Sequence, residues 1–214
     1  MKVLVACEYS GAVRDAFNAL GHDATSCDLL PSDKGGKHYQ GSVLDIINKG
    51  WDLMVAHPPC TYLAVSGNRW LYNKDGSKNA ERWENRAEAL EFVRLLMDAP
   101  IERIAIENPV SVISSQIRKA DQVIQPWQFG DEAQKTTCLW LKNLPQLKPT
   151  KIVGKGEFVT FKSGKKHPKW YADAFSKAKT KAERQKLRSK TFQGIADAMA
   201  WQWGKHPTTM PKMN

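Results

Sequence analysis

The sequence lacks paired cysteines and any hydrophobic run long enough to cross a membrane. Its four cysteines (Cys7, Cys27, Cys60 and Cys138) are scattered, with no Cys-x-x-Cys pair. This spacing argues against a zinc finger or a disulfide framework, so we expect reduced thiols and no metal site. The apolar start of the chain meets Glu8 too soon for a signal-peptide core. We therefore expect a cytoplasmic protein without membrane segments.

Acidic residues are scarce in one segment, from Lys142 to Lys190. This segment holds 15 Lys or Arg against three acids, a local net charge of +12, whereas the whole chain has +10. The rest of the chain therefore sums to about −2. A near-neutral body with one strongly basic segment indicates a polyanionic partner such as nucleic acid. A lysine-rich surface kept for solubility is the alternative.

Apolar runs and helical patterns alternate through the first two thirds of the chain. Strands are predicted over 3–6, 25–29, 51–56 and 104–106, and helices from Ser10 to Leu20 and from Ala80 to Asp98. This alternation predicts an α/β, Rossmann-like fold with a mostly parallel sheet and helices on both faces.

The chain is expected to have three parts. Residues 1–145 form the catalytic core, and residues 146–190 form a small basic insertion with a hairpin near 158–161 and a helix around 174–187. Residues 191–214 return to the core as an apolar helix.

Polar residues and a cysteine lie at the ends of the predicted strands. Ligands of parallel sheets bind at the carboxyl ends of the strands, so this coincidence predicts a site there. The residues concerned are Ser10, Asp28, Asp45, Cys60 and Glu107.

The most distinctive local pattern is His57-Pro58-Pro59-Cys60, directly after an apolar strand. Two prolines cannot continue a sheet, so the chain must turn and leave the next side chain at the mouth of the strand. We expect an exposed thiol at this point, although a buried structural cysteine after a turn is the alternative.

A second pattern, Glu107-Asn108, ends the strand over 104–106. A carboxylate next to a carboxamide offers donors and acceptors that can read the edge of a base. If Glu107 is desolvated, we expect its pKa to rise, so that it holds a proton against a ring nitrogen.

In this order, these motifs resemble those of the DNA cytosine-C5 methyltransferases, over nearly the whole chain. Pro59-Cys60 with Ser66-Gly67 is similar to the catalytic loop of that family, and Glu107-Asn108 to its Glu-Asn motif. The resemblance implies the class I S-adenosylmethionine fold and a small, phage-like member of the family. It further implies a monomer acting on duplex DNA with a flipped cytosine.

The resemblance also assigns roles to individual residues. Cys60 is implied as the nucleophile that adds to C6, with Glu107 and Asn108 as its catalytic partners. The residues implied to bind S-adenosylmethionine are Glu8, Ser10, Gly11, Asp28, Asp45, Pro58 and Gly194. Those implied to contact the substrate or DNA are Ser66, Gly67, Trp70, Lys135, Lys165, Lys166 and Lys169.

The chain departs from the family pattern at three places. The first loop lacks the full set of glycines, Pro109 follows Glu-Asn where valine is usual, and Lys135 stands where an arginine is expected. The target-recognition region is also much smaller than usual. Three alternatives therefore stay open: an amino-group methyltransferase, a pyrimidine-modifying enzyme that acts on a free nucleotide or transfers another group, and a non-catalytic DNA-binding protein.

Overall fold

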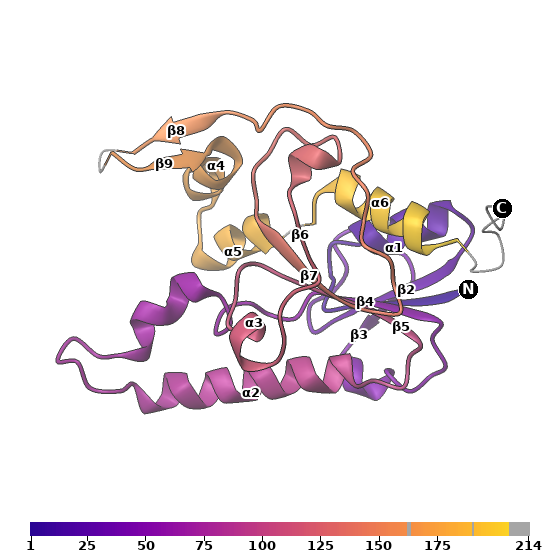
Figure 1. Ribbon diagram of the computed structural model, residues 1–214, viewed down its shortest axis with the longest axis horizontal. Coiled ribbons are helices and arrows are strands. Elements are labelled where there is room, and N and C mark those ends of the chain that lie inside the picture. Colours follow the sequence, from indigo (N-terminus) through magenta and orange to yellow (C-terminus); the bar gives the residue numbers. More distant parts are fainter. Residues whose placement is uncertain (162–163, 190, 206–214) are drawn as a thin grey trace.

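A seven-stranded sheet forms the centre of the computed structural model, which describes residues 1–161, 164–189 and 191–205 (Figure 1). The strand order is β3-β2-β1-β4-β5-β7-β6. β1 to β5 are parallel, and β7 runs antiparallel to both β5 and β6. The strands are β1 (Lys2–Ala6), β2 (Asp23–Asp28), β3 (His38–Gln40), β4 (Leu53–Ala56), β5 (Arg103–Asn108), β6 (Gln122–Ile124) and β7 (Thr137–Lys142).

Helices cover both faces of this sheet (Figure 1). Val3 and Val5 of β1 face α1 (Ala12–Ala19) and α6 (Gln193–Trp203), whereas Leu4 and Ala6 face α2 (Ala80–Met97) and α3 (Ile113–Gln116). The alternation of side chains along a strand explains why two consecutive apolar residues enter different cores. The predicted fold class, an α/β fold with a mostly parallel sheet and helices on both faces, is confirmed.

Only the second half of α2 packs on the sheet. Leu90, Val93 and Leu96 are buried, whereas Trp83 in the first half of the helix is 37% exposed. The first half of α2 and the preceding η2 (Val65–Leu71) project beyond the core as an arm (Figure 1). Among the described residues, no helix is both long and apolar enough to cross a membrane.

The basic segment contains a hairpin, β8 (Phe158–Thr160) with β9 (Lys166–Pro168), as predicted. The single helix predicted around 174–187 is wrong: the structure has α4 (Lys169–Lys177) and α5 (Lys181–Ser189). Thr180 Oγ1 accepts from Glu183 N at 3.1 Å, and Glu183 Oε2 accepts from Lys179 N at 2.7 Å. These contacts satisfy free backbone donors at the start of α5, so the local sequence favours a new helix there. The remaining short elements are η1 (Val43–Asp45) and η3 (Pro126–Gln128).

Candidate active site

The register of the sheet brings four strand ends into one row. Ala6 pairs with Cys27 and Ala56, and Ala56 pairs with Ile106. The next residue along each strand therefore lies at the same edge: Cys7, Asp28, His57 and Glu107. The sequence-predicted carboxylates and the Pro-Pro-Cys turn thus lie at one edge of the sheet.

The Pro-Pro turn holds Cys60 outside the sheet. Asn108 is almost completely buried, and its Nδ2 donates to the Pro58 carbonyl at 2.8 Å. The Cys60 carbonyl then accepts from Leu63 N and Ala64 N, which starts a tight turn. Cys60 is the exposed cysteine of the four, as the Pro-Pro pattern predicted. Asn108 fixes the position of the Pro-Pro-Cys loop through this contact.

Glu107 is mostly buried and pairs with His57. The Nδ1 atom of His57 lies 3.0 Å from Glu107 Oε2, with side chains 11% and 14% exposed. Burial alone raises the pKa of the Glu107 carboxyl, but the hydrogen bond from His57 and the charge of Lys135 outweigh it, and the pKa is lowered. The expectation of a raised pKa is therefore wrong, because the sequence did not reveal the His57 contact.

The Cys60 thiol has the opposite shift. Burial among neighbouring atoms and the charge of Glu107 raise the pKa of this thiol, and Lys135 and Arg188 offset only part of the effect. A nearby carboxylate disfavours a second negative charge. Cys60 is thus accessible but protonated at neutral pH, and a reaction at this thiol must remove its proton.

Glu8 shapes the loop between β1 and α1. This buried carboxylate accepts from Val13 N at 2.7 Å and from Arg14 N at 3.3 Å, and Ser10 Oγ lies 3.3 Å away. A carboxylate at a helix N-terminus satisfies its free donors and complements its dipole. Gly11 begins the helix at φ 73°, a left-handed conformation that favours glycine.

A cavity of about 590 Å³ opens beside this loop, and its volume is within the range of small-molecule sites. Its lining has one negatively charged residue, Asp33, and two positively charged residues, Lys34 and Lys186. A zwitterionic ligand would therefore suit this cavity. The cavity is lined by Ser10, Ala12, Asp33, Lys34, Lys186, Thr191 and Gln193.

Of the residues predicted to bind a cofactor, Ser10 lines this cavity, whereas Glu8, Gly11, Asp28, Asp45, Pro58 and Gly194 do not. Asp28 accepts from Leu30 N at 2.9 Å, and Asp45 accepts from the Tyr39 hydroxyl at 3.1 Å. Gly194 donates its backbone N–H to Asp131 at 2.8 Å, and a Cβ there would meet Phe129 O at 1.9 Å. Pro58 is buried beneath the Cys60 turn. Gly194 is thus required for close packing and does not line the cavity.

Helix α5 covers the cavity, and its Lys186 belongs to the lining. The Tyr9 hydroxyl donates to Lys186 O at 3.1 Å and lies 2.7 Å from Ser189 Oγ. Lys186 forms an ion pair with Asp33. The basic segment therefore reaches the strand ends. Sequence reasoning missed Tyr9 and Lys186, because these contacts join positions about 150 to 180 residues apart.

The residues predicted to contact DNA lie on both sides of Cys60. On the arm, Ser66 is exposed, and Trp70 is 53% exposed with the Arg69 guanidinium 4.3 Å above its ring. Gly67 packs against Arg82. Lys135 lies near Glu107 and Cys60, where its charge lowers the pKa of each group.

In the basic segment, Lys165, Lys166 and Lys169 are exposed. Lys169 forms an ion pair with Asp173 at 2.9 Å. The neighbouring Trp170 is partly buried and donates its indole N–H to Gln134 O at 3.0 Å. Trp170 therefore anchors the basic segment to the core.

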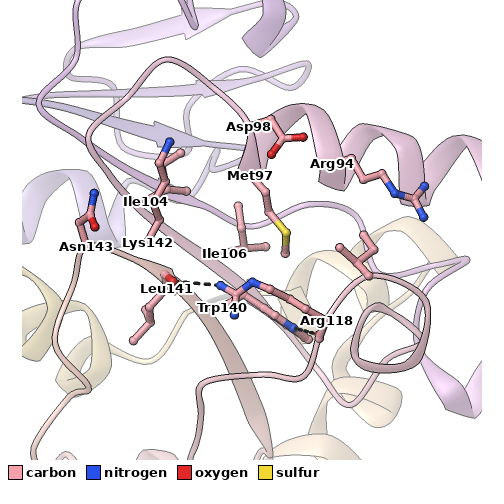
Figure 2. A pocket seen from close by; sticks show the side chains of 11 residues that line it. Arg94, Met97, Asp98, Ile104, Ile106, Arg118, Trp140, Leu141, Lys142 and Asn143 are labelled. Atoms are coloured by element: carbon pink, nitrogen blue, oxygen red, sulfur yellow. Dashed lines mark hydrogen bonds between the residues drawn. The ribbon is translucent and has the colours of Figure 1, made fainter.

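A second cavity, of about 520 Å³, lies between α2 and the β5–β7 side of the sheet (Figure 2). The Trp140 indole donates to Arg118 O at 2.8 Å, and Arg118 Nη2 donates to Leu141 O at 2.9 Å across its floor. Its lining includes none of the residues predicted for the site.

No protein-family model and no curated protein matches this sequence. Among solved structures, the chain is similar to a candidate DNA modification methyltransferase encoded within a prophage of E. coli (13% identity, TM-score 0.46) and to the Entamoeba histolytica methyltransferase EhMeth (16% identity, TM-score 0.48). Each similarity covers 72% of this chain, and the chain spans only 52% and 57% of the two proteins. Similarities this distant say nothing about the chemistry of this chain's own residues.

Proposed function

We propose that this chain is an S-adenosylmethionine-dependent methyltransferase that acts on C5 of cytosine in DNA. The observation that carries the proposal is the row of strand ends, with an exposed Cys60 after β4 and the buried His57–Glu107 pair between β4 and β5. A nucleophile and a carboxyl group at adjacent strand ends fit the two edges of one pyrimidine ring.

The cavity beside Ser10 fits the cofactor. Lys34 and Lys186 suit its carboxylate, and Asp33 and the nearby buried Glu8 suit its ammonium group. Asp28, after β2, is positioned like the acidic residue that binds ribose hydroxyls in nucleotide-binding α/β folds. When bound, the cofactor supplies an electrophilic methyl group.

The chain's own residues would activate the ring. The exposed Cys60 thiol first loses its proton to solvent, the thiolate adds to C6, and the electrons of the C5–C6 double bond move toward C5 and N3. Glu107, which is ionised in the free protein because its pKa is lowered, takes up a proton when the ring binds and excludes water, and the acid then donates to N3 and stabilises the charge that develops there. After C5 is methylated, a base removes the C5 proton, the C6–S bond breaks and the Cys60 thiolate is restored.

DNA would approach between the arm and the basic segment. Both lie beyond the carboxyl ends of the parallel strands (Figure 1). The exposed Trp70 and its stacked Arg69 offer a surface for bases, and the lysines of the basic segment offer contacts for phosphates.

Methyl transfer tests this function directly. The wild-type protein is incubated with methyl-labelled cofactor and mixed-sequence duplex DNA, and the DNA is digested to nucleosides. The proposal expects the label in 5-methylcytosine, and no label with Cys60→Ser. Label in an N4-methylated base would assign an amino-group methyltransferase, and label only on a free pyrimidine nucleotide would assign a nucleotide-modifying enzyme.

A further inference from the structure

We propose that His57 is a positioning residue that controls the proton on Glu107, an inference that rests on the proposed function. His57 opens the pattern His57-Pro58-Pro59-Cys60, but neither the pattern nor the family resemblance gives it a role. It precedes the Pro-Pro turn, and its side chain meets the carboxyl group that the reaction needs in its acidic form.

The backbone and the ring of His57 are both fixed. Its N–H donates to the Ala6 carbonyl at 2.9 Å, which anchors the residue between β1 and β4. Its Nδ1 atom then lies 3.0 Å from Glu107 Oε2, with both side chains largely excluded from water. An ionised carboxylate only accepts, so Nδ1 carries the proton and donates.

The other ring nitrogen provides an independent observation. With Nδ1 protonated in a neutral ring, Nε2 is an acceptor, and it is buried with no partner among the residues that the structure describes. Buried polar atoms are nearly always satisfied. His57 therefore has room for one further donor, from water or from a ligand, and its ring is oriented entirely by the contact with Glu107.

The groups around the His57–Glu107 pair make the protonation of Glu107 depend on the hydrogen bond from His57. Lys135, before β7, favours the ionised form of Glu107, and Glu107 in turn disfavours the thiolates of Cys60 and Cys138. His57 is the group that hydrogen-bonds Glu107 directly. Its donor stabilises the carboxylate and so makes Glu107 a stronger acid.

The proton balance follows from this arrangement. Glu107 is ionised in the free protein, so its Oε1 takes up a proton from solvent when the cytosine ring binds and excludes water. As the Cys60 sulfur bonds to C6, this proton passes from Oε1 to N3, and the carboxylate formed again is stabilised through Oε2 by the His57 Nδ1–H. When the C6–S bond breaks, the proton returns from N3 to Oε1. His57 keeps its own proton throughout and acts only through Glu107.

The titration of Glu107 tests this role without cofactor or DNA. Protein with ¹³C-labelled glutamate carboxyls is titrated by NMR, and Glu107→Gln identifies the signal. In His57→Leu the midpoint should move to higher pH, because the donor is lost. In His57→Asn it should stay near the wild-type value, because an amide N–H can donate from nearly the same position. An unchanged midpoint in His57→Leu would overturn the proposal.

Two further measurements keep the test decisive. If His57→Leu does not fold, His57→Ala is titrated with and without imidazole, and the midpoint should rise without imidazole and return with it. For methyl transfer, His57→Leu should move the loss of rate at high pH upward, whereas a merely structural role lowers the rate equally at every pH. If no protein transfers methyl groups, the proposed function fails while the NMR result still decides the role of His57.

Discussion

At the residue scale, the reactivity of Cys60 depends on its carboxylate neighbour. The negative charge of Glu107 helps to raise the pKa of the thiol. In Glu107→Gln, the pKa of Cys60 should therefore fall, and more thiolate should be present at neutral pH. We predict that iodoacetamide alkylates Cys60 roughly threefold faster at pH 7.5 in this variant, measured by mass spectrometry of the modified peptide.

Cys60→Ser provides the control, because the buried Cys27 and Cys138 should not react at that rate. Arg188→Gln should have the opposite effect, since the positive charge of Arg188 lowers the pKa of the thiol. Slower alkylation in Glu107→Gln than in the wild type would contradict this electrostatic account.

Asp28 is the residue expected to bind the cofactor ribose. Replacement by alanine removes a charged acceptor, so we predict about tenfold or greater loss of cofactor affinity by calorimetry. Asp28→Asn separates two effects, because it keeps an oxygen that can accept from Leu30 N but loses the charge. Asp23→Ala, at the opposite end of β2, should leave affinity unchanged. Equal affinities in all three variants would remove Asp28 from the cofactor site.

At the element scale, β1, β4 and β5 could be predicted, because each is an apolar run followed by polar residues. β2 (Asp23–Asp28) was predicted over 25–29, although Asp, Thr and Ser interrupt its apolar residues. β6 and β7 could not be predicted, because β6 has only three residues and β7 reverses the direction of the sheet by pairing with β5. The break between α4 and α5 depends on the cap formed by Thr180 and Glu183. The sequence does not reveal this cap, because helix-forming residues stand on both sides of it.

The residues of the candidate site also divide into those that could be predicted from the sequence and those that could not. Cys60 and Glu107 could be predicted, because strand ends are visible in the sequence. The direction of the Glu107 pKa could not, because it depends on the contact of His57 across 50 residues. His57 could have been suspected from its place beside the Pro-Pro turn, whereas the contacts of Lys186 with Asp33 and Tyr9 leave no local pattern.

Helix α5 should affect cofactor retention. Lys186 lines the cavity and pairs with Asp33, so Lys186→Gln should speed cofactor dissociation by up to about fivefold, the range of an exposed ion pair. Stopped-flow measurement of dissociation tests this prediction. Lys177→Gln is a matched control, because Lys177 is exposed and pairs within α4. Equal rates in both variants and the wild type would show that α5 does not close the cavity.

The exposed lysines of the basic segment should determine the salt dependence of DNA binding. Replacing Lys165, Lys166 and Lys169 with glutamine should reduce the slope of log affinity against log salt by about two contact equivalents. We expect less than three because Lys169 is already paired with Asp173. Lys49→Gln with Lys119→Gln is a control of similar charge outside the segment. An unchanged slope in the triple variant would instead identify a surface kept for solubility.

At the scale of the whole molecule, a near-neutral sheet carries a basic segment that folds back over its strand ends. Trp170 anchors this segment to the core, and α5 covers the cavity beside Ser10. Under the proposed function, the same segment would offer charge to DNA and close the cofactor cavity. Binding of either ligand is expected to favour the other, because both order the same helix.

The central claim is that Cys60 forms a covalent bond with a cytosine ring in DNA. Duplex DNA containing 5-fluorocytosine tests it, because fluorine at C5 cannot leave as the proton does, and the adduct persists after methylation. With cofactor present, wild-type protein should gain the mass of the DNA strand at the peptide carrying Cys60, and Cys60→Ser should gain none. Methylation of ordinary DNA without any trapped adduct on the fluorinated duplex, or an adduct at another cysteine, would contradict the account.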